Sequence, residues 1–210
     1  MKIEVINASM NFSELVIFKD FTTTFSSGNI YRIKGENGSG KTVLLKLLAG
    51  YMKLSSGLIK QDAIEVGGQK RRFIDNAGII IESPQFLGHL TLWENLQLLK
   101  SMNKKINDEV LENWIDFFKI EEFKSTKYKH CSLGTKQKMS IIQACAHDPE
   151  VLLLDEPFNS LDQGSSQKFM DYLLEVSKDR IIILATHINT DISGLSAKEF
   201  LIEEGKIHSL

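Results

Sequence analysis

The feature that most constrains this 210-residue chain is a glycine-rich octapeptide near its beginning. Residues 35–42 read GENGSGKT, which fits the pattern G-x-x-x-x-G-K-[ST]. An apolar run at 30–33 precedes the octapeptide, and apolar residues at helical spacing follow it from Lys41 until Gly50. A strand, a glycine-rich loop and a helix in this order predict a loop whose backbone N–H groups curl around the β-phosphate of a nucleotide.

The same loop carries groups for the rest of a magnesium nucleotide. We expect Lys41 to place its charge between the β- and γ-phosphates, and the Thr42 hydroxyl to ligate Mg²⁺. The other residues of the predicted phosphate site are Asn37, Gly38, Ser39 and Gly40. A glycine-rich turn that only caps a helix is the alternative, and the agreement of the pattern with its setting favours the phosphate site.

Two adjacent acids form a second candidate site. Residues 152–156 read LLLDE, which places Asp155 and Glu156 at the carboxyl end of a buried strand, where open α/β sheets bind their ligands. Asp155 can hold the metal directly or through water, and Glu156 can polarise a water that attacks the γ-phosphate. A solvated turn is the alternative, but the presence of the phosphate loop favours the hydrolytic role.

The remaining apolar patterns indicate an α/β fold. Continuous apolar runs at 151–154 and 181–184, joined by a helical pattern at 167–176, predict central strands of a parallel sheet covered on both faces. Residues 2–34 form short apolar runs separated by polar turns, which predict strands, and residues 92–118 have a helical pattern. The chain is long enough for one domain, with room for a lobe inserted into it.

Composition excludes several classes of protein. The chain is 42% hydrophobic and 25% charged with a net charge of −2, so it lacks the basic excess of a nucleic-acid-binding protein. No apolar run approaches the roughly 20 residues of a membrane span, and the first residues lack a signal peptide's apolar core, so we expect a cytosolic protein. Cys131 and Cys145 have no zinc-site spacing and are expected to be reduced thiols.

In their order, these motifs resemble the ATP-binding cassette family over essentially the whole chain. Residues 132–137 read SLGTKQ and stand where the family carries its signature sequence, usually LSGGQ, from which Cys131, Leu133 and Thr135 depart. Ser132 and Gly134 are retained, and a hydroxyl and a bare amide at a helix start suit a phosphate. The resemblance implies that this phosphate belongs to ATP held by the opposite subunit. Without the resemblance, Ser132 is an ordinary N-cap.

Three further positions resemble family motifs. Asp162, in the tripeptide 160–162, resembles the D-loop that crosses the dimer interface, and His187 resembles the switch histidine that hydrogen-bonds the γ-phosphate. In isolation the first is a helix cap and the second a surface polar residue. Phe12 is similar in place to the aromatic residue that stacks on adenine, with Phe18 as a rival and a core role as the alternative for either.

Glu82 is the most informative departure, because the family normally has the glutamine of its Q-loop there. A glutamine amide can coordinate Mg²⁺ through its oxygen, and a carboxylate can bind the metal more strongly with a different charge and pH response. The surrounding residues 80–84 and 90–96 resemble the subgroup that exports, or confers immunity to, bacitracin and lantibiotic-type peptides. Haem-export and general drug-export cassettes share much of this pattern.

The resemblance implies a P-loop NTPase (RecA-like) core with a mainly parallel sheet, an N-terminal antiparallel β subdomain and an inserted α-helical subdomain. It assigns 1–85 and 146–210 to the core with its β subdomain, and 86–145 to the helical lobe that carries the signature. It also implies an ATPase that uses ATP and Mg²⁺ and closes head to tail on itself or on a related subunit. A separate membrane-spanning permease would hold it at the inner face of the cell membrane, with export favoured by the subgroup.

Three other functions compete with this one. A soluble cassette acting on DNA, ribosomes or protein assembly usually has two fused cassettes or long coiled coils, and neither feature is in the sequence. A P-loop kinase needs an acceptor pocket and a lid, and does not need the signature serine and glycine. A non-hydrolysing partner in a heterodimer remains open because of the altered signature, but four hydrolytic residues argue against it: Lys41, Asp155, Glu156 and His187.

Overall fold

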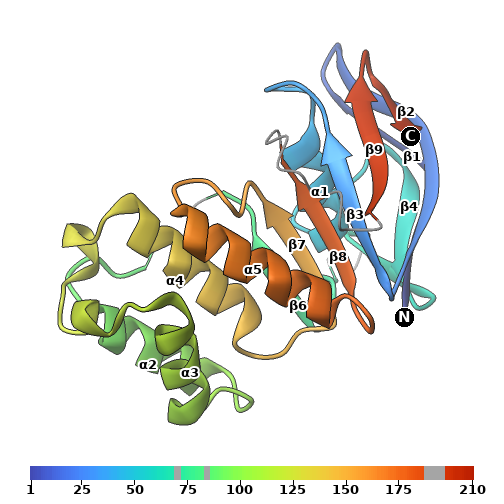
Figure 1. The fold of residues 1–210 in the computed structure, drawn as a ribbon. Coiled ribbons are helices and arrows are strands. Elements are labelled where there is room, and N and C mark those ends of the chain that lie inside the picture. Colours follow the sequence, from blue (N-terminus) through green and yellow to red (C-terminus); the bar gives the residue numbers. More distant parts are fainter. Residues whose placement is uncertain (69–71, 83–85, 187–196) are drawn as a thin grey trace.

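Figure 1 shows the arrangement of the chain in a computed structural model, which describes residues 1–68, 72–82, 86–186 and 197–210. An antiparallel sheet lies at one end, a mainly parallel sheet occupies the middle, and a helical lobe lies at the other end (Figure 1). None of the helices in these ranges is both long and apolar enough to cross a membrane.

The antiparallel sheet has four strands in the order β2-β1-β4-β5. Its strands are β1 (Lys2–Phe12), β2 (Leu15–Ser26), β4 (Ser56–Gln61) and β5 (Ile64–Val66). In β1 the buried face changes from odd to even positions between Val5 and Ala8, where the pairing with β2 shifts register and Asn7 takes a φ of 46°. This irregularity keeps both halves of the long strand facing the core.

The second sheet has six strands in the order β10-β9-β3-β8-β7-β6. Its strands are β3 (Asn29–Lys34), β6 (Ala77–Ile80), β7 (Val151–Asp155), β8 (Ile181–Ala185), β9 (Ala197–Glu203) and β10 (Lys206–Ser209). All pairings are parallel except that of β9 with β10, which forms a hairpin at the C-terminus. β7 and β8 are buried along almost their whole length, which explains their continuous apolar runs.

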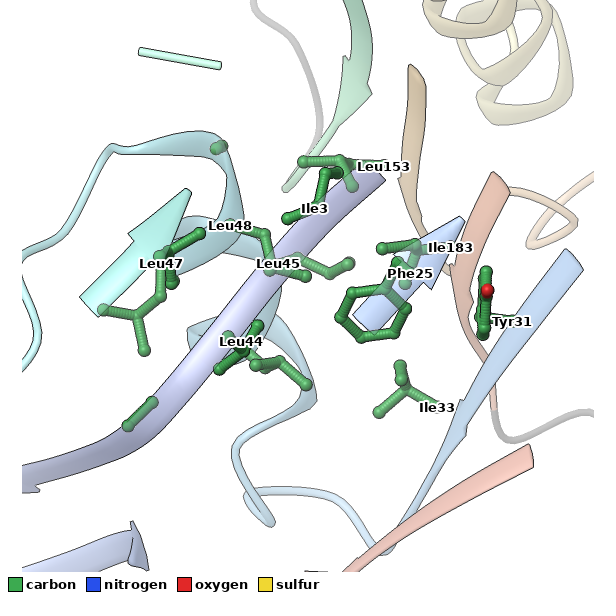
Figure 2. Close-up of a cluster of buried hydrophobic side chains, with 14 of the residues drawn as sticks. Ile3, Phe25, Tyr31, Ile33, Leu44, Leu45, Leu47, Leu48, Leu153 and Ile183 are labelled. Carbon is green, nitrogen blue, oxygen red and sulfur yellow. The ribbon is translucent and has the colours of Figure 1, made fainter. Parts of the chain in front are cut away.

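One hydrophobic core lies between the two sheets and surrounds α1 (Lys41–Ala49). Figure 2 shows Leu45 and Leu48 of this helix together with Ile3 from β1 and Leu153 from β7, and all four side chains are fully buried. α1 ends at Gly50, which has a φ of 80° in the left-handed region, as predicted from the sequence. The phosphate loop is therefore continuous with a helix that is packed from both sides.

A second core fills the opposite face of the parallel sheet. Its helices are α2 (Leu92–Met102), α3 (Asp108–Phe118), α4 (Leu133–Cys145) and α5 (Gln163–Val176), with short 3₁₀ turns at Glu121–Phe123 and Tyr128–His130. The helical pattern at 92–118 is divided into α2 and α3, because the chain becomes extended at Asn103. The Asn107 side chain then accepts a hydrogen bond from the Val110 N–H at 2.8 Å and starts a new helix.

Gly78 marks the closest approach of α4 to the sheet. A Cβ atom at this position would lie 2.0 Å from the carbonyl oxygen of Ala144 and 2.8 Å from Cδ2 of Leu152. Because the first of these atoms belongs to the helix backbone, room for a methyl group requires the helix and β6 to separate.

We therefore predict that Gly78→Ala lowers the free energy of unfolding by about 1–3 kcal/mol, measured by urea denaturation. Gly164→Ala is the matched control, because its Cβ would only meet Oδ1 of Asp162 at 3.4 Å in the first turn of α5. Alanine should be neutral or stabilising there. Equal losses in both variants would contradict the steric explanation.

Candidate nucleotide-binding site

The phosphate loop connects β3 to α1, and its glycines adopt backbone conformations that a residue with a side chain rarely adopts. Gly40 has a φ of 106°, and a Cβ atom there would lie 2.5 Å from Cγ2 of Ile17. Gly38 has a φ of 83° and open space around it. Gly40 is also the N-cap of α1 and supplies no side-chain cap, so the first amides of this helix are free of side-chain competition for an anion.

Lys41 is buried, and its ammonium group is held by the loop itself. Its Nζ donates hydrogen bonds to the carbonyl oxygens of Gly35 at 2.7 Å and Glu36 at 2.9 Å. A buried ammonium group requires hydrogen-bond acceptors, and these two carbonyl oxygens keep the charge of Lys41 beside the loop. This is the placement that a lysine needs to meet the outer phosphates of a nucleotide.

Thr42 and Asp155 meet directly across the site. The Thr42 hydroxyl donates to Oδ2 of Asp155 at 2.5 Å, which joins the start of α1 to the end of β7. Burial raises the pKa of Asp155 above its ordinary value, the Thr42 hydrogen bond acts in the opposite direction, and the charges of Glu156 and Glu82 raise it further. A carboxylate in such surroundings is stabilised by a bound cation.

Glu156 begins a tight turn after β7. Its φ is 46°, and its backbone N–H donates to the carbonyl of Ala185 at 2.8 Å, which fixes the turn to β8. This turn borders an open pocket of about 260 Å³. Its lining includes Asn37, Gly38, Gly40, Lys41 and Thr42 from the loop, and Asp155 and Glu156 from the end of β7. The pocket thus brings together most of the residues predicted for phosphate binding with Asp155, predicted for the metal, and Glu156, predicted for hydrolysis.

Ile17 and Val43 also line this pocket, and sequence reasoning did not identify them. Their apolar character gives no signal for a site, because it is equally typical of core residues. A larger cavity of about 650 Å³ lies beside β4 and β5 and includes Gln61, Arg72 and Glu150. None of the predicted site residues lines that cavity, so its size does not make it the functional site.

Two observations test whether these residues fit a magnesium nucleotide. The buried Oγ of Ser39 has no hydrogen-bond partner among the described residues, as expected for a loop hydroxyl beside a phosphate. The described part of the chain contains no group of three histidine, cysteine or acidic residues that could hold a metal by itself. A metal at Thr42 and Asp155 must therefore share its coordination with nucleotide oxygens and water, as Mg²⁺ commonly does.

The signature and D-loop residues lie together on other elements, outside the pocket lining described above. The Ser132 hydroxyl caps α4 by accepting from the Thr135 N–H at 3.1 Å, and a Cβ atom on Gly134 would lie 2.8 Å from the carbonyl oxygen of Ser160. Asp162 caps α5 by accepting from the Ser165 N–H at 2.8 Å. These three predicted residues therefore do not line the pocket that the phosphate loop forms in their own chain.

The two candidate adenine-stacking aromatics differ in exposure. Phe12 is 44% exposed at the end of β1, opposite Leu15 in the hairpin with β2. Phe18 is fully buried and packs edge-on against Phe21 with ring centroids 6.4 Å apart. The core role considered for Phe18 is therefore its observed role, and Phe12 is the accessible ring of the two.

Glu82 follows β6 with a φ of 60°, and its carboxylate accepts a hydrogen bond from Nζ of Lys46 at 2.5 Å. Ile80 of β6 pairs with Leu154 of β7, so Glu82 leaves the sheet at the same edge as Asp155. His187 lies outside the described residues.

The cysteines lie away from this pocket. Burial raises the pKa of the Cys145 thiol to about 12, and it also raises that of Cys131 above its ordinary value. Both thiols are therefore protonated at neutral pH, which agrees with the absence of any predicted chemistry for them.

Comparison with known proteins decides the family, because the sequence profile of the ABC transporter family matches residues 18–159. The chain belongs to this family. The Bacillus subtilis ABC transporter ATP-binding protein YybJ is 32% identical over 99% of this chain and 95% of its own length. YdbJ of the same organism is 33% identical over 91% of this chain, which spans 63% of the length of YdbJ. The bacitracin transport ATP-binding protein BcrA of Bacillus licheniformis is 33% identical over 86% of this chain and 60% of its own length.

Solved structures agree with the fold. An ATP-binding subunit of an ABC transporter superposes with a TM-score of 0.85 at 24% identity, covering 100% of this chain and 90% of that one. The ATP-binding cassette MJ0796, described as a dimer bound to ADP and Pi, gives a TM-score of 0.83 at 20% identity, covering 99% and 97% of the two chains. The predicted α/β P-loop NTPase fold is confirmed, and so is the predicted membership of the ATP-binding cassette family.

The pH dependence of folding stability tests whether the Asp162 carboxylate, beside the signature, is held by its neighbours in the folded state. Hydrogen bonds from the Ser165 hydroxyl and N–H, followed by the Lys138 ammonium at 3.0 Å, hold the pKa of Asp162 well below its ordinary value of 3.8. A lowered pKa in the folded state means that the charged form adds stability above pH 3.8, and that this stability is lost as the pH falls through the folded-state pKa.

We predict that Asp162→Asn, which keeps a capping oxygen but loses the charge, lowers the free energy of unfolding by roughly 0.5–1 kcal/mol at pH 7. The difference from the unaltered protein should stay constant from pH 7 to about pH 5 and shrink below about pH 4. Urea denaturation at several pH values measures it. A difference that does not change down to pH 3 would show that the carboxylate is not held in the folded state.

Proposed function

We propose that this chain is the ATP-driven motor of a membrane exporter, which closes head to tail on a second cassette and acts on a membrane-spanning partner. The observation that carries this proposal is the division of the predicted site. Lys41 and Glu156 line one pocket, while Ser132 and Asp162 cap helices outside its lining. A site divided in this way is completed by a second copy of the chain or a related subunit.

Within this proposal each group has a defined task. The amides of the phosphate loop and Lys41 bind the phosphates, and Thr42 and Asp155 hold Mg²⁺. Glu156 accepts a proton from the attacking water, and Phe12 stacks on adenine. When bound, ATP with Mg²⁺ supplies the γ-phosphate whose transfer to water releases the closed pair. Ser132, Gly134 and Asp162 are assigned to the opposite nucleotide. His187 and Glu82 are assigned to the γ-phosphate and the metal of the nucleotide bound by their own chain.

The lobe 86–145 is proposed to carry the contact with the membrane partner. Leu87 is 46% exposed, yet its backbone is fixed by the buried side chain of Asn95. The Leu87 N–H donates to Oδ1 of Asn95 at 2.9 Å, and Nδ2 of Asn95 donates to the Leu87 carbonyl at 3.1 Å. A rigid loop that presents an apolar side chain is suited to receive a helix from a permease. This contact would hold the chain at the inner face of the membrane.

Export is proposed from the resemblance of residues 80–84 and 90–96 to the bacitracin and lantibiotic subgroup, because the names of the relatives do not agree on a direction. BcrA of Enterococcus faecalis, named for bacitracin transport, is 27% identical over 99% of this chain and 70% of its own length. A relative named for spermidine and putrescine import, PotA of Aggregatibacter actinomycetemcomitans, is 32% identical over 98% of this chain and 56% of its own length. Because the translocation path belongs to the membrane chain, the partner determines the direction and the cargo.

We predict that Glu156→Gln binds ATP with Mg²⁺, loses hydrolysis by a factor on the order of 10² to 10⁴, and accumulates as a dimer when ATP is present. Calorimetry, phosphate release without any added acceptor and light scattering after size exclusion measure these three properties. Monomers that retain full turnover would contradict the assignment of Glu156.

Two variants that each remove a helix cap distinguish a role of Ser132 in the dimer contact from its role in stability. In the Glu156→Gln protein, Ser132→Ala should abolish the ATP-dependent dimer, whereas Thr91→Ala, which removes the capping hydroxyl of α2, should leave it intact. Each variant loses a helix cap worth about 1 kcal/mol. Equal dimerisation in both would show that Ser132 is only a cap.

The transport role predicts a second polypeptide. We expect the chain purified from gently solubilised membranes to bring with it a hydrophobic protein with several membrane spans. Replacing Leu87 by Asp should release that protein while ATP binding persists, because a charge is costly in an apolar contact. Leu98→Asp, at an exposed position of α2, is the control. Recovery of the chain only from the soluble fraction, with nucleic acid or ribosomes attached, would contradict the transport role.

A further inference from the structure

Lys46 and Glu82 form an ion pair beside the proposed metal position. Lys46 lies one helical turn after Thr42 on α1, so both residues project from the same face of that helix. The 2.5 Å contact between Nζ of Lys46 and Oε1 of Glu82 links α1 to the end of β6.

The position of Glu82 places its charge near the carboxylates of β7. β6 and β7 are parallel neighbours, and Glu82 lies two residues beyond the Ile80–Leu154 pair. The backbone of Glu82 has a φ of 60°, in the left-handed region that is unusual for a residue with a side chain.

Stability alone gives little reason for this pair. The Glu82 side chain is 69% exposed and that of Lys46 27% exposed, and such surface pairs contribute little to folding. The charge arrangement gives a better reason. Glu82 leaves the sheet at the same edge as Asp155, and a carboxylate that pairs with an ammonium group binds a metal less strongly.

We propose that Lys46 is a positioning residue that competes with Mg²⁺ for the Glu82 carboxylate and so weakens metal binding at the nucleotide site. Lys46 thereby offsets the extra negative charge that glutamate brings to this position, and keeps the metal exchangeable. The proposal rests on the proposed function, because it concerns the metal that accompanies ATP.

The test uses Mn²⁺ as the probe, in the Glu156→Gln protein with ATP bound. Electron paramagnetic resonance of free Mn²⁺ gives its dissociation constant for four proteins: Glu156→Gln alone, with Lys46→Met, with Glu82→Gln, and with both changes. Lys46→Met should tighten Mn²⁺ binding about 3- to 10-fold when Glu82 is present. It should change binding less than about twofold in the Glu82→Gln background, where no carboxylate can be released.

Two results would overturn the proposal. An equal change in both backgrounds would mean that Lys46 acts only through its charge, and no change in either would mean that the pair does not involve the metal. Lys46→Gln, a smaller disturbance of α1, should behave as Lys46→Met does. Calorimetry of ATP binding at saturating Mg²⁺ is run on all four proteins. Loss of ATP binding in all of them would overturn the proposed nucleotide site itself, whereas retained ATP binding with background-independent Mn²⁺ affinity overturns only the role of Lys46.

Discussion

The burial of α1 between the two sheets is the constraint on which the site depends. Leu44, Leu45, Leu47 and Leu48 are at most 1% exposed, so the helix has apolar contacts on more than one side. Burying one leucine contributes roughly 1.5–3 kcal/mol, so the four together far exceed the cost, about 1 kcal/mol, of leaving the first turn of α1 without a side-chain cap. The packing therefore holds the uncapped amides and Lys41 in place, and the antiparallel sheet matters to the site because it closes one side of this helix.

The second core connects the signature helix to the hydrolytic turn. Nε2 of Gln137 on α4 donates to the carbonyl of Pro157 at 2.8 Å, immediately after Glu156. Lys138, the next residue of α4, pairs with Asp162 at 3.0 Å. α4 and the turn that follows β7 are thus joined by side chains as well as by packing. Within the proposed function, these bonds would transmit a displacement of the helical lobe to Glu156, and so connect a membrane partner to the proposed base.

Much of this arrangement could be predicted, because the sequence patterns that indicate it involve residues close together in the chain. The phosphate loop, the buried strand before Asp155 and the glycine stop at Gly50 each depend on neighbours in sequence. The Lys46–Glu82 pair could not be predicted, because its members lie 36 residues apart and meet only because α1 packs against the sheet that contains β6. The break between α2 and α3 was missed because the apolar spacing continues across it, and the side-chain cap of Asn107 overrides that spacing.

The departure of Thr135 from the family signature has a physical consequence. The Ser132 and Thr135 hydroxyls lie 2.9 Å apart, and either one can be the donor. If Ser132 donates, its proton is held within its own chain, and if Thr135 donates, the Ser132 proton is free to meet a phosphate. In the proposed dimer, a phosphate from the opposing subunit would select the second arrangement, in which the Ser132 proton is available to it.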